Sequence, residues 1–183
     1  MPDIRRIQNE LRAAGVDGWL LYDFHNRDAI AYHVLGMDYG KFTSRRWFYW
    51  IPADGEPVRL CHKVESTKLD SLPGPKRLYL SWRELHASLT EILAPARKIA
   101  MQYSPMANIP YVSIVDGGTV DLVRSLGFEV VSSAGLVQPF QAVRRAPARN
   151  APVQRQDGEQ QFRAMPHIQD QISPPLGEGD TGV

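Results

Sequence analysis

The chain has 183 residues, 43% of them apolar, and a formal net charge of +1 from 21 lysine and arginine residues and 20 aspartate and glutamate residues. This length allows one domain with a sizeable core, and the balanced charge gives no support for a chain that binds nucleic acid along its whole length. One cysteine excludes an internal disulfide framework, and the lack of a long apolar segment or signal peptide predicts a cytoplasmic protein that does not bind membranes.

The first predicted elements are a helix, a strand and a second helix. Apolar residues recur at helical spacing from Ile4 to Ala14, with Asp3 placed to cap the helix and Gly15 to stop it. The apolar run 18–22 predicts a buried strand. Residues 28–35 predict a short helix that is closed by Gly36.

A hairpin is predicted next. The aromatic run 47–51 is a strand ended by Pro52, residues 53–56 have turn chemistry, and 57–64 is the return strand. Alternation along the return strand places Val58, Leu60, His62 and Val64 on one face. The consecutive aromatic side chains fill both faces of their strand, which favours burial in a sheet that is covered on both sides.

The rest of the chain alternates strands and helices until residue 143. We expect strands at 77–80, 98–101 and 128–131 and helices that begin at residues 81–82, 116–117 and 134. Alternation of this kind predicts an α/β fold, and the hairpin requires at least one antiparallel pair, so the sheet is mixed.

Residues 144–183 differ in composition from residues 1–143. They contain 5 proline, 4 glycine and 6 glutamine residues, whereas the preceding 143 residues contain only 4 glutamines. Their apolar residues follow no helical or strand period, so they bury too little surface to offset the entropy lost on folding. We therefore expect one domain, residues 1–143, followed by a disordered tail.

The side chains themselves do not form a complete catalytic motif. None of the five histidines is paired with another at a metal-binding spacing, and His25, after the first strand, is the best candidate for a function. Asp116 and the two glycines after it fit either a phosphate cradle or an ordinary helix cap. Arg45 and Arg46, before the aromatic run, leave an RNA-stacking surface open as an alternative to a buried strand. Cys61 is interpreted as an inert core thiol.

Several runs, in order, resemble the N-terminal domain of the creatinase/prolidase/aminopeptidase P family of metallopeptidases. They are Gly18-Trp-Leu-Leu-Tyr-Asp-Phe-His-Asn26, Arg45-Arg-Trp-Phe-Tyr-Trp-Ile-Pro52, Gly55-Glu-Pro-Val-Arg-Leu60, Ile99-Ala-Met-Gln-Tyr-Ser104, Asp116-Gly-Gly-Thr-Val120 and Gly127-Phe-Glu-Val-Val-Ser-Ser133. The resemblance implies a mixed, six-stranded sheet flanked by helices. In the family, a catalytic domain follows, in which two Asp, one His and two Glu hold two manganese or cobalt ions.

This chain departs from the family pattern after Val143. The tail resembles a frameshifted or truncated form of the family's linker, no position matches a metal ligand, and so we assign no catalytic residue, metal or cofactor to this chain. The resemblance implies a domain that is inactive alone, forms a substrate rim and binds a second copy of the chain or a catalytic domain. From the balanced charge, we expect no nucleic-acid partner. The rim candidates are Asp23, His25, Asn26, Arg45 and Arg46. A stand-alone binding or regulatory module is the alternative.

Overall fold

The computed structural model describes residues 1–141, so the disorder predicted for the tail lies outside the described range. The helices and strands are α1 (Ile4–Ala13), β1 (Gly18–Asp23), α2 (Ala29–Leu35), β2 (Trp47–Pro52), β3 (Val58–His62), β4 (Lys76–Tyr79), α3 (Trp82–Leu93), β5 (Lys98–Met101), α4 (Gly117–Ser125), β6 (Glu129–Ser132) and α5 (Ala134–Gln141). Three short 3₁₀ helices, η1 (Lys63–Glu65), η2 (Pro105–Ala107) and η3 (Pro110–Val112), complete this part of the chain.

The six strands form one mixed sheet in the order β4-β3-β2-β1-β5-β6. β2 is antiparallel to β1 and β3, and the remaining neighbours are parallel. The predicted α/β class, with a mixed sheet of about six strands flanked by helices, is therefore confirmed.

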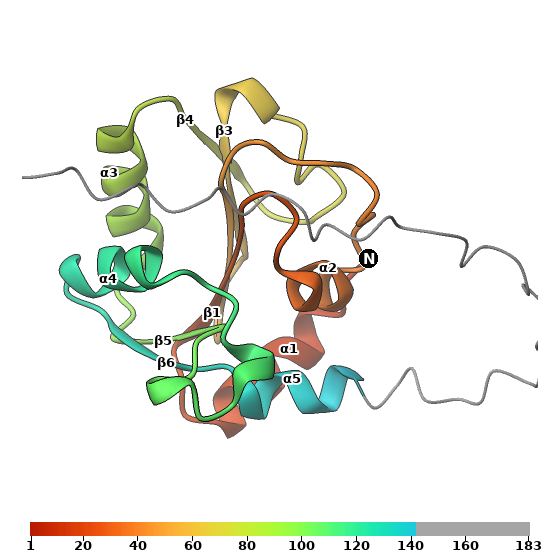
Figure 1. Cartoon of the computed structure of the whole chain (residues 1–183), viewed down its shortest axis with the longest axis vertical. Helices are drawn as coiled ribbons and strands as arrows, with labels where there is room; N and C mark the ends of the chain where they lie inside the picture. Colours follow the sequence, from red (N-terminus) through yellow and green to blue (C-terminus); the bar gives the residue numbers. More distant parts are fainter. Residues whose placement is uncertain (142–183) are drawn as a thin grey trace, which may run out of the picture. The chain divides into compact units, whose positions relative to one another are not determined.

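Helices cover both faces of the sheet, which Figure 1 shows nearly edge-on: α1, α2 and α5 lie on one side, and α3 and α4 on the other. The aromatic residues of β2 divide between the two cores, with Trp47 and Tyr49 in one and Phe48 and Trp50 in the other. Their exposure is 4% or less, so these rings are core residues and form no stacking surface. Among residues 1–141, no helix is long and apolar enough to cross a membrane.

Helix ends follow the predicted capping chemistry. The carboxylates of Asp3, Asp28 and Asp116 each accept a hydrogen bond from a backbone N–H in the first turn of α1, α2 and α4. Asp116 also accepts from the Thr119 hydroxyl, which supports the cap over the phosphate cradle. Ser81 forms a capping box with Glu84 at the start of α3.

The predicted return strand is too long at its end. β3 stops at His62, and η1 begins there, because the His62 ring caps the backbone N–H of Val64. Val64 was expected on the same face as Leu60, but its side chain is 65% exposed, whereas Leu60 is buried. Strand alternation does not extend past a side-chain cap of this kind.

Candidate functional site

The predicted rim residues lie at one edge of the sheet. β1, β3, β4, β5 and β6 all end at this edge and β2 begins there, because β2 alone runs opposite to its neighbours. The loops 24–28 and 36–46, together with η1, therefore lie near one another at the top of Figure 1. Loops at the carboxyl ends of strands are the usual location of binding sites in α/β sheets.

Asp23 anchors the first of these loops. Its side chain is buried, and its carboxylate accepts hydrogen bonds from the backbone N–H groups of Asn26 (3.1 Å), Arg27 (2.7 Å) and Asp28 (2.9 Å) and from the Tyr32 hydroxyl (3.1 Å). These bonds hold His25 and Asn26 at φ values of 62° and 54°, a left-handed conformation that residues other than glycine rarely adopt. The buried carboxylate of Asp23 thus fixes the backbone conformation of the loop at residues 24–28.

Asn26 joins this loop to the next one. Its Nδ2 donates to the carbonyls of Tyr39 (2.8 Å) and Lys41 (3.1 Å), and its Oδ1 accepts from the Thr43 N–H (2.9 Å). The Tyr39 hydroxyl donates back to the Asn26 carbonyl at 2.6 Å. The two loops are therefore held together at Asn26, through both its side-chain amide and its backbone carbonyl.

Glu65, on η1, holds the end of the second loop. Its carboxylate accepts from the Thr43 hydroxyl (2.5 Å), the Ser44 N–H and hydroxyl (both 2.7 Å) and the Arg45 N–H (3.3 Å). Partial burial would raise the pKa of Glu65, but the hydrogen bonds from Thr43, Ser44 and Arg45 outweigh it and lower the pKa. The sequence carries no signal for this contact, because it joins residues 20 positions apart across what was predicted to be the end of a strand.

The other three rim candidates differ in exposure. His25 is exposed, stacks on the Phe24 ring at 3.9 Å and lies 5.3 Å from the Phe42 ring. Arg45 is also exposed, whereas Arg46 is half-buried and its carbonyl accepts from the Tyr79 hydroxyl at 2.6 Å. His25 and Arg45 are thus the predicted residues best placed to meet a ligand, and the rim role of all five stays a prediction.

A cleft of about 640 Å³ lies beside these loops, between segments 36–42 and 64–71. Its lining includes two apolar side chains that are more than half exposed, Phe42 (67%) and Val64 (65%). Lys41 and Lys68 contribute ammonium groups, and the Lys68 Nζ donates to the Lys41 carbonyl at 2.5 Å. Burial lowers the pKa of Lys68, and the nearby carboxylates oppose this shift. The cleft thus combines apolar and charged surface.

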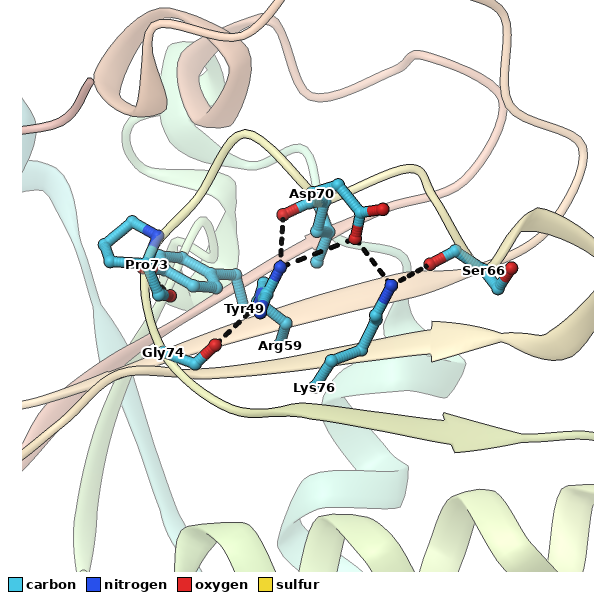
Figure 2. A network of polar contacts seen from close by, with 8 residues as sticks. Tyr49, Arg59, Ser66, Asp70, Pro73, Gly74 and Lys76 are labelled. Atoms are coloured by element: carbon cyan, nitrogen blue, oxygen red, sulfur yellow. Dashed lines mark hydrogen bonds and ion pairs between the residues drawn. The ribbon is translucent and has the colours of Figure 1, made fainter.

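A polar network holds the 64–71 wall of the cleft against the sheet (Figure 2). Asp70 forms ion pairs with Lys76 (2.6 Å) and Arg59 (3.4 Å), and Lys76 also donates to the Ser66 carbonyl. The Arg59 Nε donates to the Gly74 carbonyl at 2.9 Å. In the same network, the Tyr49 hydroxyl donates to the Pro73 carbonyl at 3.0 Å. Because β2, β3 and β4 all contribute side chains, this wall is attached to the rigid part of the domain.

Two further titratable groups, Asp28 and Cys61, are buried near this end of the sheet. Burial raises the pKa of Asp28 to about 7, and the adjacent Asp23 carboxylate contributes to this shift. Burial also raises the pKa of the Cys61 thiol to about 11, which supports the interpretation of an inert core cysteine.

The family resemblance places a two-metal centre in a separate catalytic domain, and the described residues do not fit such a centre. Nowhere in residues 1–141 do three or more His, Cys, Asp or Glu side chains form a group that could hold a metal ion. His25 is close to Asp23 in sequence, but both oxygens of Asp23 are engaged by backbone and tyrosine donors. We therefore derive no metal-dependent step from this domain.

Comparison of the fold with solved structures gives consistent matches. The chain matches a proline dipeptidase from Streptococcus pneumoniae with a TM-score of 0.59 and 15% identity, over 78% of this chain and 99% of that chain. It matches the creatinase/prolidase N-terminal domain of an X-Pro dipeptidase from Streptococcus pyogenes with a TM-score of 0.54 and 13% identity, over 74% and 96% of the two chains.

A third match is to a longer chain. The dipeptidase PepE from Mycobacterium ulcerans matches with a TM-score of 0.56 and 16% identity, over 78% of this chain but only 36% of that chain. No family model and no curated protein sequence matches this chain. The similarity therefore lies in the fold: residues 1–141 have the fold of the creatinase/prolidase N-terminal domains of Xaa-Pro dipeptidases.

Proposed function

We propose that this chain serves as the N-terminal domain of a Xaa-Pro peptidase-like or creatinase-like metallohydrolase, and that it has no hydrolase activity alone. The observation that carries the proposal is the pattern of coverage. The chain matches nearly all of two solved chains from proline dipeptidases, but about a third of a longer dipeptidase. In this proposal the protein is cytoplasmic, and another chain or domain supplies the metal ligands.

The carboxyl edge of the sheet supports a contact role for the domain. Phe42 and Val64 line the cleft and are more than half exposed, and Tyr39, three residues before Phe42, is half exposed. Exposed apolar side chains that lie together often mark an interaction surface. His25 and Arg45 add an imidazole and a guanidinium beside them. We propose that this edge contributes to the substrate rim, and that it also contacts a catalytic domain or a second copy of the chain.

We expect the purified chain not to hydrolyse Xaa-Pro dipeptides or creatine, with or without added Mn²⁺ or Co²⁺. The reason is that two bound metal ions require several carboxylates and a histidine that converge on one point, and residues 1–141 contain no such group. A full-length dipeptidase such as PepE, assayed under the same conditions, is the positive control. Metal-restored turnover that is lost on His25→Ala would contradict the proposal and place His25 in a catalytic site.

The coding DNA distinguishes this proposal from the alternative, a stand-alone binding or regulatory module. A reading frame beyond codon 143 that encodes the two Asp, one His and two Glu of a catalytic domain would support the metallohydrolase. Absence of such a frame, together with an inactive chain, would favour the module instead. Both readings use the same surface around the cleft.

A further inference from the structure

We propose that His62 is a pH-sensitive switch for the loop at residues 43–45. The neutral imidazole of His62 holds this loop in place, and protonation of the imidazole releases the loop. The geometry is that of one ring between two backbone groups. His62 Nδ1 lies 3.1 Å from the Val64 nitrogen, and Nε2 lies 3.2 Å from the Leu80 carbonyl oxygen. This proposal concerns the regulation of the cleft, and only its functional consequence rests on the proposed function.

The two backbone partners determine the tautomer of the ring. The Val64 N–H can only donate, so Nδ1 must present its lone pair, and the Leu80 carbonyl can only accept, so Nε2 must carry the hydrogen. A second proton would have to bind at Nδ1. It would then face the Val64 N–H, so that two donors would oppose each other and the cap of η1 would be lost.

The cap matters because η1 carries Glu65. Glu65 is the last residue of η1, three positions after His62. Its carboxylate holds Thr43, Ser44 and Arg45 through four hydrogen bonds. Val64 and Glu65 also line the cleft. Loss of the cap would therefore loosen the loop at 43–45 and change one wall of the cleft in the same step.

The groups around His62 do not supply a replacement acceptor at Nδ1. Its own turn brings Lys63 and Glu65, and the Glu65 oxygens are already engaged by the loop. On β4, Tyr79 meets the ring edge-on at 5.1 Å, and its hydroxyl donates to the Arg46 carbonyl.

The remaining neighbour is α3. Its Glu84 carboxylate accepts from the Leu80 N–H at 2.6 Å and from the Ser81 N–H, as part of the α3 cap. The loss of the acceptor therefore decides the effect of protonation.

The test is amide hydrogen exchange of the full chain, followed by NMR at Ser44 and Arg45 and corrected for the intrinsic effect of pH. Lowering the pH from 7.5 to 5.5 is expected to reduce the protection of these amides about fivefold, the effect of losing one side-chain cap. His62→Gln can donate to Leu80 and accept from Val64 without titrating, so its protection should not change with pH. His86→Gln, on α3, should respond as the wild type does.

A wild-type pH response in His62→Gln, or its loss in His86→Gln, would overturn the proposal. Should His62→Gln fail to fold, the imidazole nitrogen shifts of the wild type decide the question. They must show Nε2–H at pH 7.5 and titrate with the same midpoint as the Ser44 amide, and a different midpoint would also overturn it. Asp28 titrates in this range too, but it caps α2, and both variants retain it. Hydrolase activity is not measured, so the result is independent of the proposed function.

Discussion

Replacing Gly74 with alanine is expected to destabilise the domain by about 3 to 5 kcal/mol. A Cβ at this position would lie 1.9 Å from the Pro57 carbonyl oxygen, so the backbone before β3 would have to move. The backbone at Gly74 also has φ +99°, which disfavours any residue with a Cβ. Urea unfolding, followed by tryptophan fluorescence, measures the change in the free energy of unfolding.

Gly127→Ala is the matched control for this prediction. Gly127 has φ +97°, but no atom lies within 4 Å of the Cβ that it would gain, so only the conformational cost of about 1 to 2 kcal/mol should appear. Equal losses in the two variants would show that the contact between Gly74 and Pro57 is not tight. That result would contradict the packing of the 66–75 segment against the sheet.

Replacing Asp23 with alanine is expected to lower the free energy of unfolding by about 3 to 4 kcal/mol. The substitution leaves the N–H groups of Asn26, Arg27 and Asp28, and the Tyr32 hydroxyl, without their acceptor. Two consecutive left-handed residues would also lose the bonds that hold them. Urea unfolding at pH 7.5 measures the loss.

Asp38→Ala is the control for this variant. Asp38 is an exposed loop residue whose carboxylate accepts a hydrogen bond from the Gly40 N–H two residues away, so its removal should cost no more than about 0.5 kcal/mol. A loss for Asp23→Ala as small as that for Asp38→Ala would mean that the loop does not depend on its buried carboxylate. Asp23 would then be free to act at the rim, as the sequence interpretation supposed.

The local chemistry of the sequence predicted most of the fold. Capping residues such as Asp3 and Ser81 and stop residues such as Gly36 mark helix ends through short-range contacts, so they can be recognised without a structure. The aromatic run 47–51 was also interpreted correctly, because side chains that fill both faces of a strand require cover on both sides. Signals of this kind depend on neighbours only a few residues away.

The candidate site was predicted only in outline. The first loop was identified from its position after a strand, and the second from its polar residues outside the core runs. The roles of Asp23 and Asn26, however, depend on contacts with backbone groups up to 17 residues away. Glu65 was missed as an anchor for the same reason, because its partners lie 20 to 22 residues before it. His62 was missed because alternation placed it inside the predicted strand 57–64. The cleft itself depends on how residues 64–71 cross one face of the sheet, which no local pattern specifies.

Sedimentation equilibrium of the full chain tests most directly whether the surface around the cleft is a contact surface. We predict that the wild type self-associates at high concentration, and that Phe42→Ser, which removes an exposed ring from the cleft, weakens the association. Trp82→Ser is the matched control, because Trp82 is 61% exposed, close to the 67% of Phe42, but begins α3 and does not line the cleft. A wild type that stays monomeric at every concentration, or a Trp82→Ser variant that weakens association as much as Phe42→Ser, would contradict the account.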